Sequence, residues 1–155
     1  MSDREKIRQN VTLIIEKAAS SASYADDMNQ VNSLLDEAER KSIKLVDKPD
    51  EIIDIQRVIL GWKIRLFCDS KLDFSTVNKL RAGLLMLGYS SLDFESSTET
   101  YFANYCLKVD QRSVAVDVLT KLLPKLLKYD EKNKSGGCRR MIKYAEELLD
   151  KAKDE

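Results

Sequence analysis

The sequence DEIIDIQRVILGWKIRLFCD occupies residues 50–69 and carries ten large apolar side chains. They recur at helical spacing, but they point in nearly every direction around the helix axis. A helix that is apolar on all sides is typical of the middle of a core. We therefore expect residues 50–69 to form the central helix of the fold, with Trp62 well buried. Pro49 suits the first turn of this helix, where its missing N–H is not needed.

Helical spacing of apolar residues continues on both sides of this segment. Ser2 and Glu5 have the spacing of a capping box, which predicts a helix that begins at the N-terminus. Residues 89–97 are polar and rich in serine, and they predict the longest internal loop. Ser96 and Glu99 form a second capping-box pair, which predicts a short aromatic helix after that loop.

The remaining breaks define the organisation of the chain. Gly88 fits the left-handed position that ends a helix, and Pro124 predicts a kink within a later helix. Residues 131–137 predict a flexible linker before the last helix. We expect an all-α fold, a bundle or helical-hairpin array of six to seven mostly antiparallel helices. With 155 residues, the chain has the length of a single domain over 1–155.

The composition removes several kinds of chemistry. There is no histidine, which excludes a Ser-His-Asp triad, a Cys-His nucleophile and a His-ligated metal. Cys68, Cys106 and Cys138 are far apart and odd in number, so they predict free thiols in a reducing compartment. No phosphate-binding glycine loop is present. We expect no enzyme activity, no cofactor and no metal.

Charge and hydropathy bear on location. The 26 basic and 26 acidic residues cancel, so the chain as a whole does not attract a membrane or a nucleic acid. A charged N-terminus without a signal-peptide core, and the lack of a long apolar run, predict a soluble cytoplasmic protein with no membrane association. The sequence leaves the oligomeric state open.

The sharpest local feature is a basic segment near the C-terminus. Residues 121–143 contain eight basic and two acidic side chains. Four lysines in it follow one helical stripe, where like charges repel. The segment predicts either a solvated face or a site for an anionic partner, either an acidic protein surface or a nucleic acid. The candidate residues are Lys121, Lys125, Lys128, Lys132, Arg139, Arg140 and Lys143.

A second candidate surface is apolar. Leu92 and Phe94 lie in the predicted polar loop, and exposed apolar loop residues often mark a partner site. With Tyr101 and Tyr105 they predict a groove, and core packing is the alternative. We therefore expect a non-enzymatic protein–protein interaction module, such as an adaptor, chaperone, inhibitor or immunity protein. It would bind through a helical groove, the basic face or both. The alternative is nucleic-acid binding through the basic stripe of residues 121–143.

Overall fold

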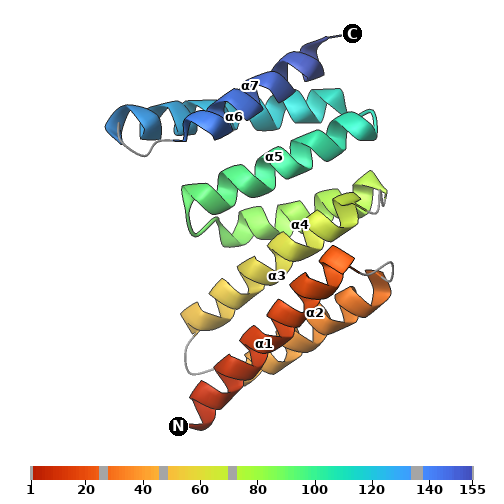
Figure 1. Cartoon of the computed structure of the whole chain (residues 1–155), viewed down its shortest axis with the longest axis vertical. Helices are drawn as coiled ribbons and strands as arrows, with labels where there is room; N and C mark the ends of the chain where they lie inside the picture. Colours follow the sequence, from red (N-terminus) through yellow and green to blue (C-terminus); the bar gives the residue numbers. More distant parts are fainter. Residues whose placement is uncertain (1, 25–27, 46–48, 70–72, 134–137, 155) are drawn as a thin grey trace. The chain divides into compact units, whose positions relative to one another are not determined.

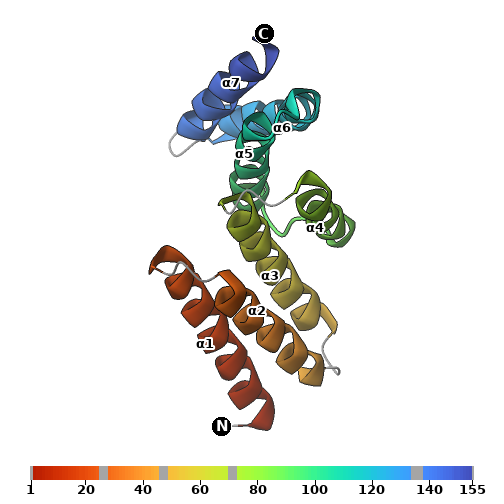
Figure 2. The ribbon, with the colours of Figure 1, turned by 90° about the vertical axis from the view of Figure 1, so that its right-hand side faces the viewer.

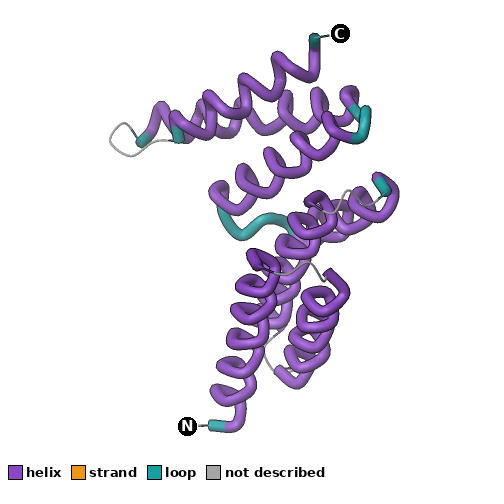
Figure 3. The backbone as a smooth tube through the Cα atoms, turned by 45° about the vertical axis from the view of Figure 1, so that its right-hand side comes forward, coloured by secondary structure: helices purple, strands orange, loops and turns teal. Residues whose placement is uncertain are grey.

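The computed structural model describes residues 2–24, 28–45, 49–69, 73–133 and 138–154. Within these ranges the chain forms α-helices and one 3₁₀ turn, with no strand (Figure 3). This confirms the predicted all-α class. The elements are α1 Asp3–Tyr24, α2 Met28–Ser42, η1 Ile43–Leu45, α3 Pro49–Asp69, α4 Phe74–Leu87, α5 Leu92–Lys108, α6 Arg112–Lys132 and α7 Arg139–Lys153.

The chain divides into two compact units. The first, the N-terminal unit, contains residues 1–70 and 77–88, and the second, the C-terminal unit, contains residues 71–76 and 89–155. The single domain over 1–155 stays a prediction, and so does the central place of residues 50–69. No described helix is long and apolar enough to cross a membrane.

In the N-terminal unit, α1 and α2 run antiparallel and side by side (Figures 1 and 2). The predicted capping box opens α1: the Glu5 N–H donates to Ser2 Oγ at 3.2 Å, and the Ser2 N–H donates to Glu5 Oε2 at 3.4 Å. α2 packs in turn against α3. The buried side chains of these three helices include Val11, Ala18, Val31, Leu35, Ala38, Ile59 and Ile64.

The burial of α3 is less complete than its sequence predicts. Ile59 and Ile64 are buried, whereas Val58 is 37% exposed. Trp62 is only partly buried, so the expectation of a well-buried indole was wrong. The Arg65 guanidinium lies 5.7 Å from the centre of the Trp62 ring, at cation–π distance. The partly exposed indole therefore has a charged neighbour.

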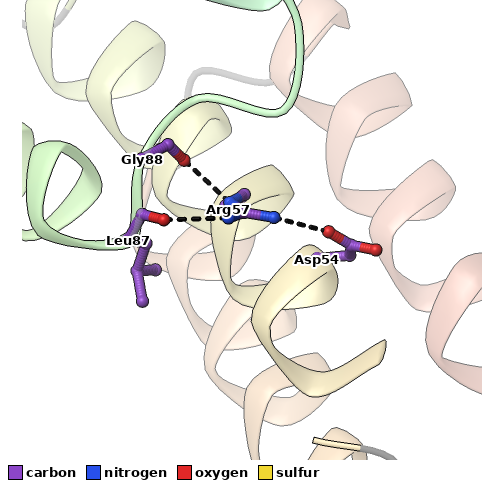
Figure 4. A network of polar contacts seen from close by, with 4 residues as sticks. All are labelled: Asp54, Arg57, Leu87 and Gly88. Carbon is purple, nitrogen blue, oxygen red and sulfur yellow. Dashed lines mark hydrogen bonds and ion pairs between the residues drawn. The ribbon is translucent and has the colours of Figure 1, made fainter. Parts of the chain in front are cut away.

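The end of α4 is fixed by a side chain from α3 (Figure 4). Arg57 donates through Nε to the Gly88 carbonyl at 2.7 Å and through Nη2 to the Leu87 carbonyl at 2.8 Å. Its Nη1 pairs with Asp54 at 2.7 Å. Gly88 has a φ of +81°, which confirms the predicted left-handed position after the helix. The Leu87 carbonyl, which has no partner within the helix, and the Gly88 carbonyl after it are thus hydrogen-bonded.

In the C-terminal unit, α5, α6 and α7 pack against one another (Figure 1). The core rings are close: the Phe102 centroid lies 6.2 Å from that of Phe74 and 6.3 Å from that of Tyr105. The other buried apolar residues of this unit include Ala103, Cys106, Ala115, Val118, Leu119, Leu122, Leu126, Ile142, Ala145 and Leu148.

The loop predicted over residues 89–97 was wrong, because α5 begins at Leu92. Ser91 is the N-cap and accepts a hydrogen bond from the Phe94 N–H at 3.1 Å. Ser96 therefore lies within the helix and is buried, and its hydroxyl donates to the Asp93 carbonyl at 3.2 Å. This hydrogen bond to a preceding carbonyl satisfies the hydroxyl of a serine that its sequence neighbours indicate as an N-cap.

The linker predicted over residues 131–137 was wrong at its start. α6 continues through Pro124 as far as Lys132, and the Asn133 N–H closes the helix on the Tyr129 carbonyl at 3.1 Å. Residues 134–137, and with them Lys134, lie outside the described residues.

Candidate functional site

The seven candidate basic residues are all exposed, and three of them form ion pairs. Lys121 pairs with Asp117 on the same helix at 3.3 Å. Lys125 pairs with Glu95 of α5 at 2.8 Å, and the Arg139 Nε lies 3.8 Å from the Asp130 carboxylate. The Lys121–Asp117 pair is exposed on both sides and is therefore weak, whereas Glu95 and Asp130 are mostly shielded from solvent. All three pairs lower the local positive charge.

These ion pairs divide the basic residues between two sides of α6. Lys125 meets α5, whereas Asp130 meets Arg139 of α7. Residues five positions apart lie about 140° apart around a helix. The four lysines of α6 therefore follow the side next to α5, and Arg139 lies near the opposite side. The basic residues whose positions these ion pairs define are therefore spread over two sides of α6.

On the α5 side of α6, two lysines stay without an ion pair to any described residue: Lys128 and Lys132. Between them in sequence lies Tyr129, which is 44% exposed. A half-exposed tyrosine carries a large apolar surface together with a hydroxyl, and such residues are enriched in the centres of protein interfaces.

A hollow of about 160 Å³ adjoins this tyrosine, and we call it the α5–α6 groove. Its walls come from the first turn of α5, the second half of α6 and the residue before α7. The lining residues are Ser91, Leu92, Asp93, Leu126, Tyr129 and Cys138. The sequence suggests Leu92 and the lysine stripe as separate candidates, but the structure brings them close together. Glu95, one turn after Leu92 in α5, forms the ion pair with Lys125.

The other predicted apolar residues do not line this groove. Phe94 is partly buried, and its ring centre lies 5.5 Å from that of Tyr89. Tyr105 is 2% exposed and belongs to the core, while Tyr101 is partly buried. For Tyr105 the core-packing alternative is therefore the one that the structure supports.

Cys138 forms one wall of the groove as a neutral thiol. Burial raises the pKa of this thiol, and the nearby Asp130 and Asp93 carboxylates raise it further, against a backbone hydrogen bond that lowers it. Its Sγ donates to the Leu126 carbonyl at 3.2 Å. A reactive thiol needs the opposite shift, toward a thiolate at neutral pH. Cys68 and Cys106 are buried thiols that form no disulfide, as their apolar neighbours predict.

The sequence did not single out Ser91, Leu126 or Tyr129 as site residues. Ser91 heads the motif Ser-Leu-Asp-Phe, with a cap followed by an acid in the first turn, and this signal was available. Leu126 and Tyr129 become neighbours of α5 only through packing, which no local pattern specifies.

Among the described residues, no three Cys, Asp or Glu side chains are grouped so that they could hold a metal ion. Comparisons with protein-family models, with curated proteins and with solved structures gave no match to this chain.

Proposed function

We propose that this chain is a non-enzymatic protein-interaction module whose α5–α6 groove binds an acidic segment of a partner protein. One apolar side chain of the partner fills the groove against Leu92 and Leu126. Acidic side chains of the same segment meet Lys128 and Lys132. The observation that carries this proposal is that the half-exposed Tyr129 lines the groove and lies between these two lysines in the sequence of α6.

The size of the groove supports a side chain as its occupant. Pockets for small-molecule ligands generally start at about 300 Å³. A hollow of about 160 Å³ is smaller, and it is lined by leucine, tyrosine and thiol groups as well as by Ser91 and Asp93. Affinity would come mostly from a few buried contacts at the centre of the interface, as in other protein complexes.

The charges support an acidic partner. Lys128 and Lys132 are solvated cations without an ion pair to a described residue, so a carboxylate costs little desolvation when it approaches them. Their attraction falls with salt, whereas the apolar contact does not. We therefore expect salt to lower the on-rate more than it raises the off-rate.

The alternative, nucleic-acid binding through the stripe, has less support. Lys121 and Lys125 are engaged in ion pairs, and Arg139 lies near the other side of α6. Fewer cations then face one phosphate backbone. The two functions differ in salt dependence, because binding to a duplex changes by about 0.9 log units per log unit of salt for each neutralised phosphate.

The test is a selection of displayed random peptides on the full chain, followed by fluorescence anisotropy with the selected peptide. We expect acidic peptides with one conserved large apolar residue. Tyr129→Ala should weaken binding by about tenfold or more. The double variant Lys128→Glu/Lys132→Glu should do the same, and Lys151→Glu/Lys153→Glu, at two exposed lysines on α7, serves as the charge-matched control.

Two outcomes would contradict the proposal. One is a set of selected peptides with no acidic bias whose affinity is unchanged in Tyr129→Ala. The other is a low-salt gel shift with DNA or RNA that the double lysine variant abolishes, with a steep salt slope. The latter result would establish the nucleic-acid alternative.

A further inference from the structure

A second pocket lies in the N-terminal unit and is lined mainly by lysines. It has a volume of about 310 Å³, and we call it the lysine pocket. Its lining side chains come from three elements: Lys6, Ile7 and Asn10 from α1, Lys41 from α2, and Lys44 from η1. All three elements pack against one another, so the fold brings Lys6 to Lys41 and Lys44, which are themselves close in sequence.

The positive charge in this pocket is only partly compensated. Lys41 pairs with Glu37 at 3.1 Å. Lys6 and Lys44 are exposed and form no ion pair with a described residue. Glu5, the acidic neighbour of Lys6, accepts a hydrogen bond from the Ser2 N–H. The lining lysines and their ion-pair partner together leave two positive charges.

Asn10 adds uncharged donors to these cations. The Lys41 Nζ donates to the Asn10 Oδ1 at 2.9 Å. An ammonium group only donates hydrogen bonds, so this contact fixes which end of the amide is the oxygen. The two N–H groups of the Asn10 amide then remain for another acceptor, and they make no hydrogen bond to a described residue.

We propose that the lysine pocket binds a phosphate monoester. Such a group carries a charge of about −1.5 to −2 near pH 7 and several acceptor oxygens. This charge matches the two uncompensated lysines, whereas a carboxylate brings only one negative charge. Lysine is a common phosphate ligand as a point charge, and the Asn10 amide supplies directional donors. Ile7 offers an apolar contact for the organic part of the ester.

The size of the pocket limits the ligand. Its volume lies at the lower end of the range for small-molecule sites, about 300–1,000 Å³. One phosphate with a small organic group fits this volume. The same chemistry occurs in a free metabolite and in the headgroup of a phosphorylated lipid, and the experiment separates these two sources.

The first arm of the experiment is an NMR titration of the full chain with glycerol 2-phosphate, and with acetate as the monoanion control. We expect saturable shifts of the backbone amides of residues 6–10 and 41–44, and weaker ones with acetate. The second arm measures co-sedimentation with phosphatidylcholine vesicles that contain phosphatidylinositol 4-phosphate. Saturable shifts with the soluble ester support a free ligand. Binding to these vesicles alone supports a lipid headgroup if the variants below weaken it.

The decisive variant is Asn10→Asp. It keeps an oxygen for Lys41 and so preserves that contact, but it removes the amide donors and adds a negative charge. We expect it to weaken phosphate binding by at least about tenfold. Lys6→Gln and Lys44→Gln should each weaken it by about threefold. Lys17→Gln, an exposed lysine on the same side of α1 three turns away, should leave it unchanged.

The proposal is overturned if Asn10→Asp folds normally by circular dichroism and binds glycerol 2-phosphate or the vesicles as tightly as the natural sequence. It is also overturned if neither probe binds, or if acetate binds as tightly as the ester. Shifts that spread over the whole chain without saturation would also overturn it, because they indicate general charge screening and not binding at a site.

Discussion

Arg57 of α3 donates a hydrogen bond to the Gly88 carbonyl at the end of α4, at 2.7 Å, and also pairs with Asp54, which lies one turn before it in α3 (Figure 4). A single guanidinium thereby connects α3 with the last carbonyl of α4 and with the carbonyl that follows it, because its Nη2 also donates to the Leu87 carbonyl. The fork geometry of arginine makes this possible, and lysine could not reproduce it.

Replacement of Arg57 by alanine should lower the free energy of unfolding by about 1–3 kcal/mol, because part-buried carbonyls would lose their partners. Asp54→Ala removes only the exposed end of the network, since Asp54 is 65% exposed, and should cost less than about 1 kcal/mol. Urea unfolding followed by circular dichroism measures both. Equal losses in the two variants would show that the contact to Gly88 adds nothing.

The cap of α5 gives a second prediction. Ser91→Ala removes the acceptor of the Phe94 N–H and should destabilise the protein by about 1 kcal/mol. Ser90 is exposed, and Ser90→Ala serves as the matched control with a change near zero. Amide hydrogen exchange in the first turn of α5 should accelerate in Ser91→Ala alone. If exchange there is the same in both variants, Ser91 is not the cap.

Adjacent residues of α3 test how the core is packed. Ile59 is 1% exposed, so Ile59→Ala should cost about 2–5 kcal/mol of unfolding free energy. Val58 is 37% exposed, and Val58→Ala should cost less than about 1 kcal/mol, in part because alanine favours the helix. Thermal unfolding compares them. A loss below about 1 kcal/mol for Ile59→Ala would refute its place in the core.

The sequence was most informative where one local interaction decides the structure. The Ser2 capping box and the left-handed Gly88 were both predicted correctly, since each depends on residues a few positions apart. The start of α5 was missed because Ser91 and Ser96 offer the same local signal. Only burial distinguishes them: Ser96 is 3% exposed and bonds back to a carbonyl, whereas Ser91 stays at the surface.

The candidate sites were predicted only in part for a related reason. Stripe spacing predicts Lys125 and Lys128 on one side of α6, and both are exposed. It did not show that Glu95 neutralises Lys125, because that contact joins residues 30 positions apart. The lysine pocket escaped prediction altogether, since Lys6 and Lys44 come together only after α1 and η1 pack. Helical periodicity therefore predicts the helices of this protein but not the contacts between residues far apart in sequence.

The last prediction concerns pH and the Cys138 thiol. Burial is the main cause that raises its pKa above the ordinary value of 9.0, so the folded protein keeps the proton when the unfolded chain has lost it. The unfolded state then binds fewer protons, and stability falls as pH rises above about 9.0. Below that pH the contribution is complete.

Cys138→Ser isolates this effect, because a serine hydroxyl can donate to the Leu126 carbonyl but does not ionise in this range. We expect the unfolding free energy of the natural sequence to decline more steeply than that of the variant as pH rises above about 9.0. Urea unfolding at a series of pH values under reducing conditions measures the two slopes. Parallel curves would mean that Cys138 ionises alike in both states, and that the groove does not shield its thiol.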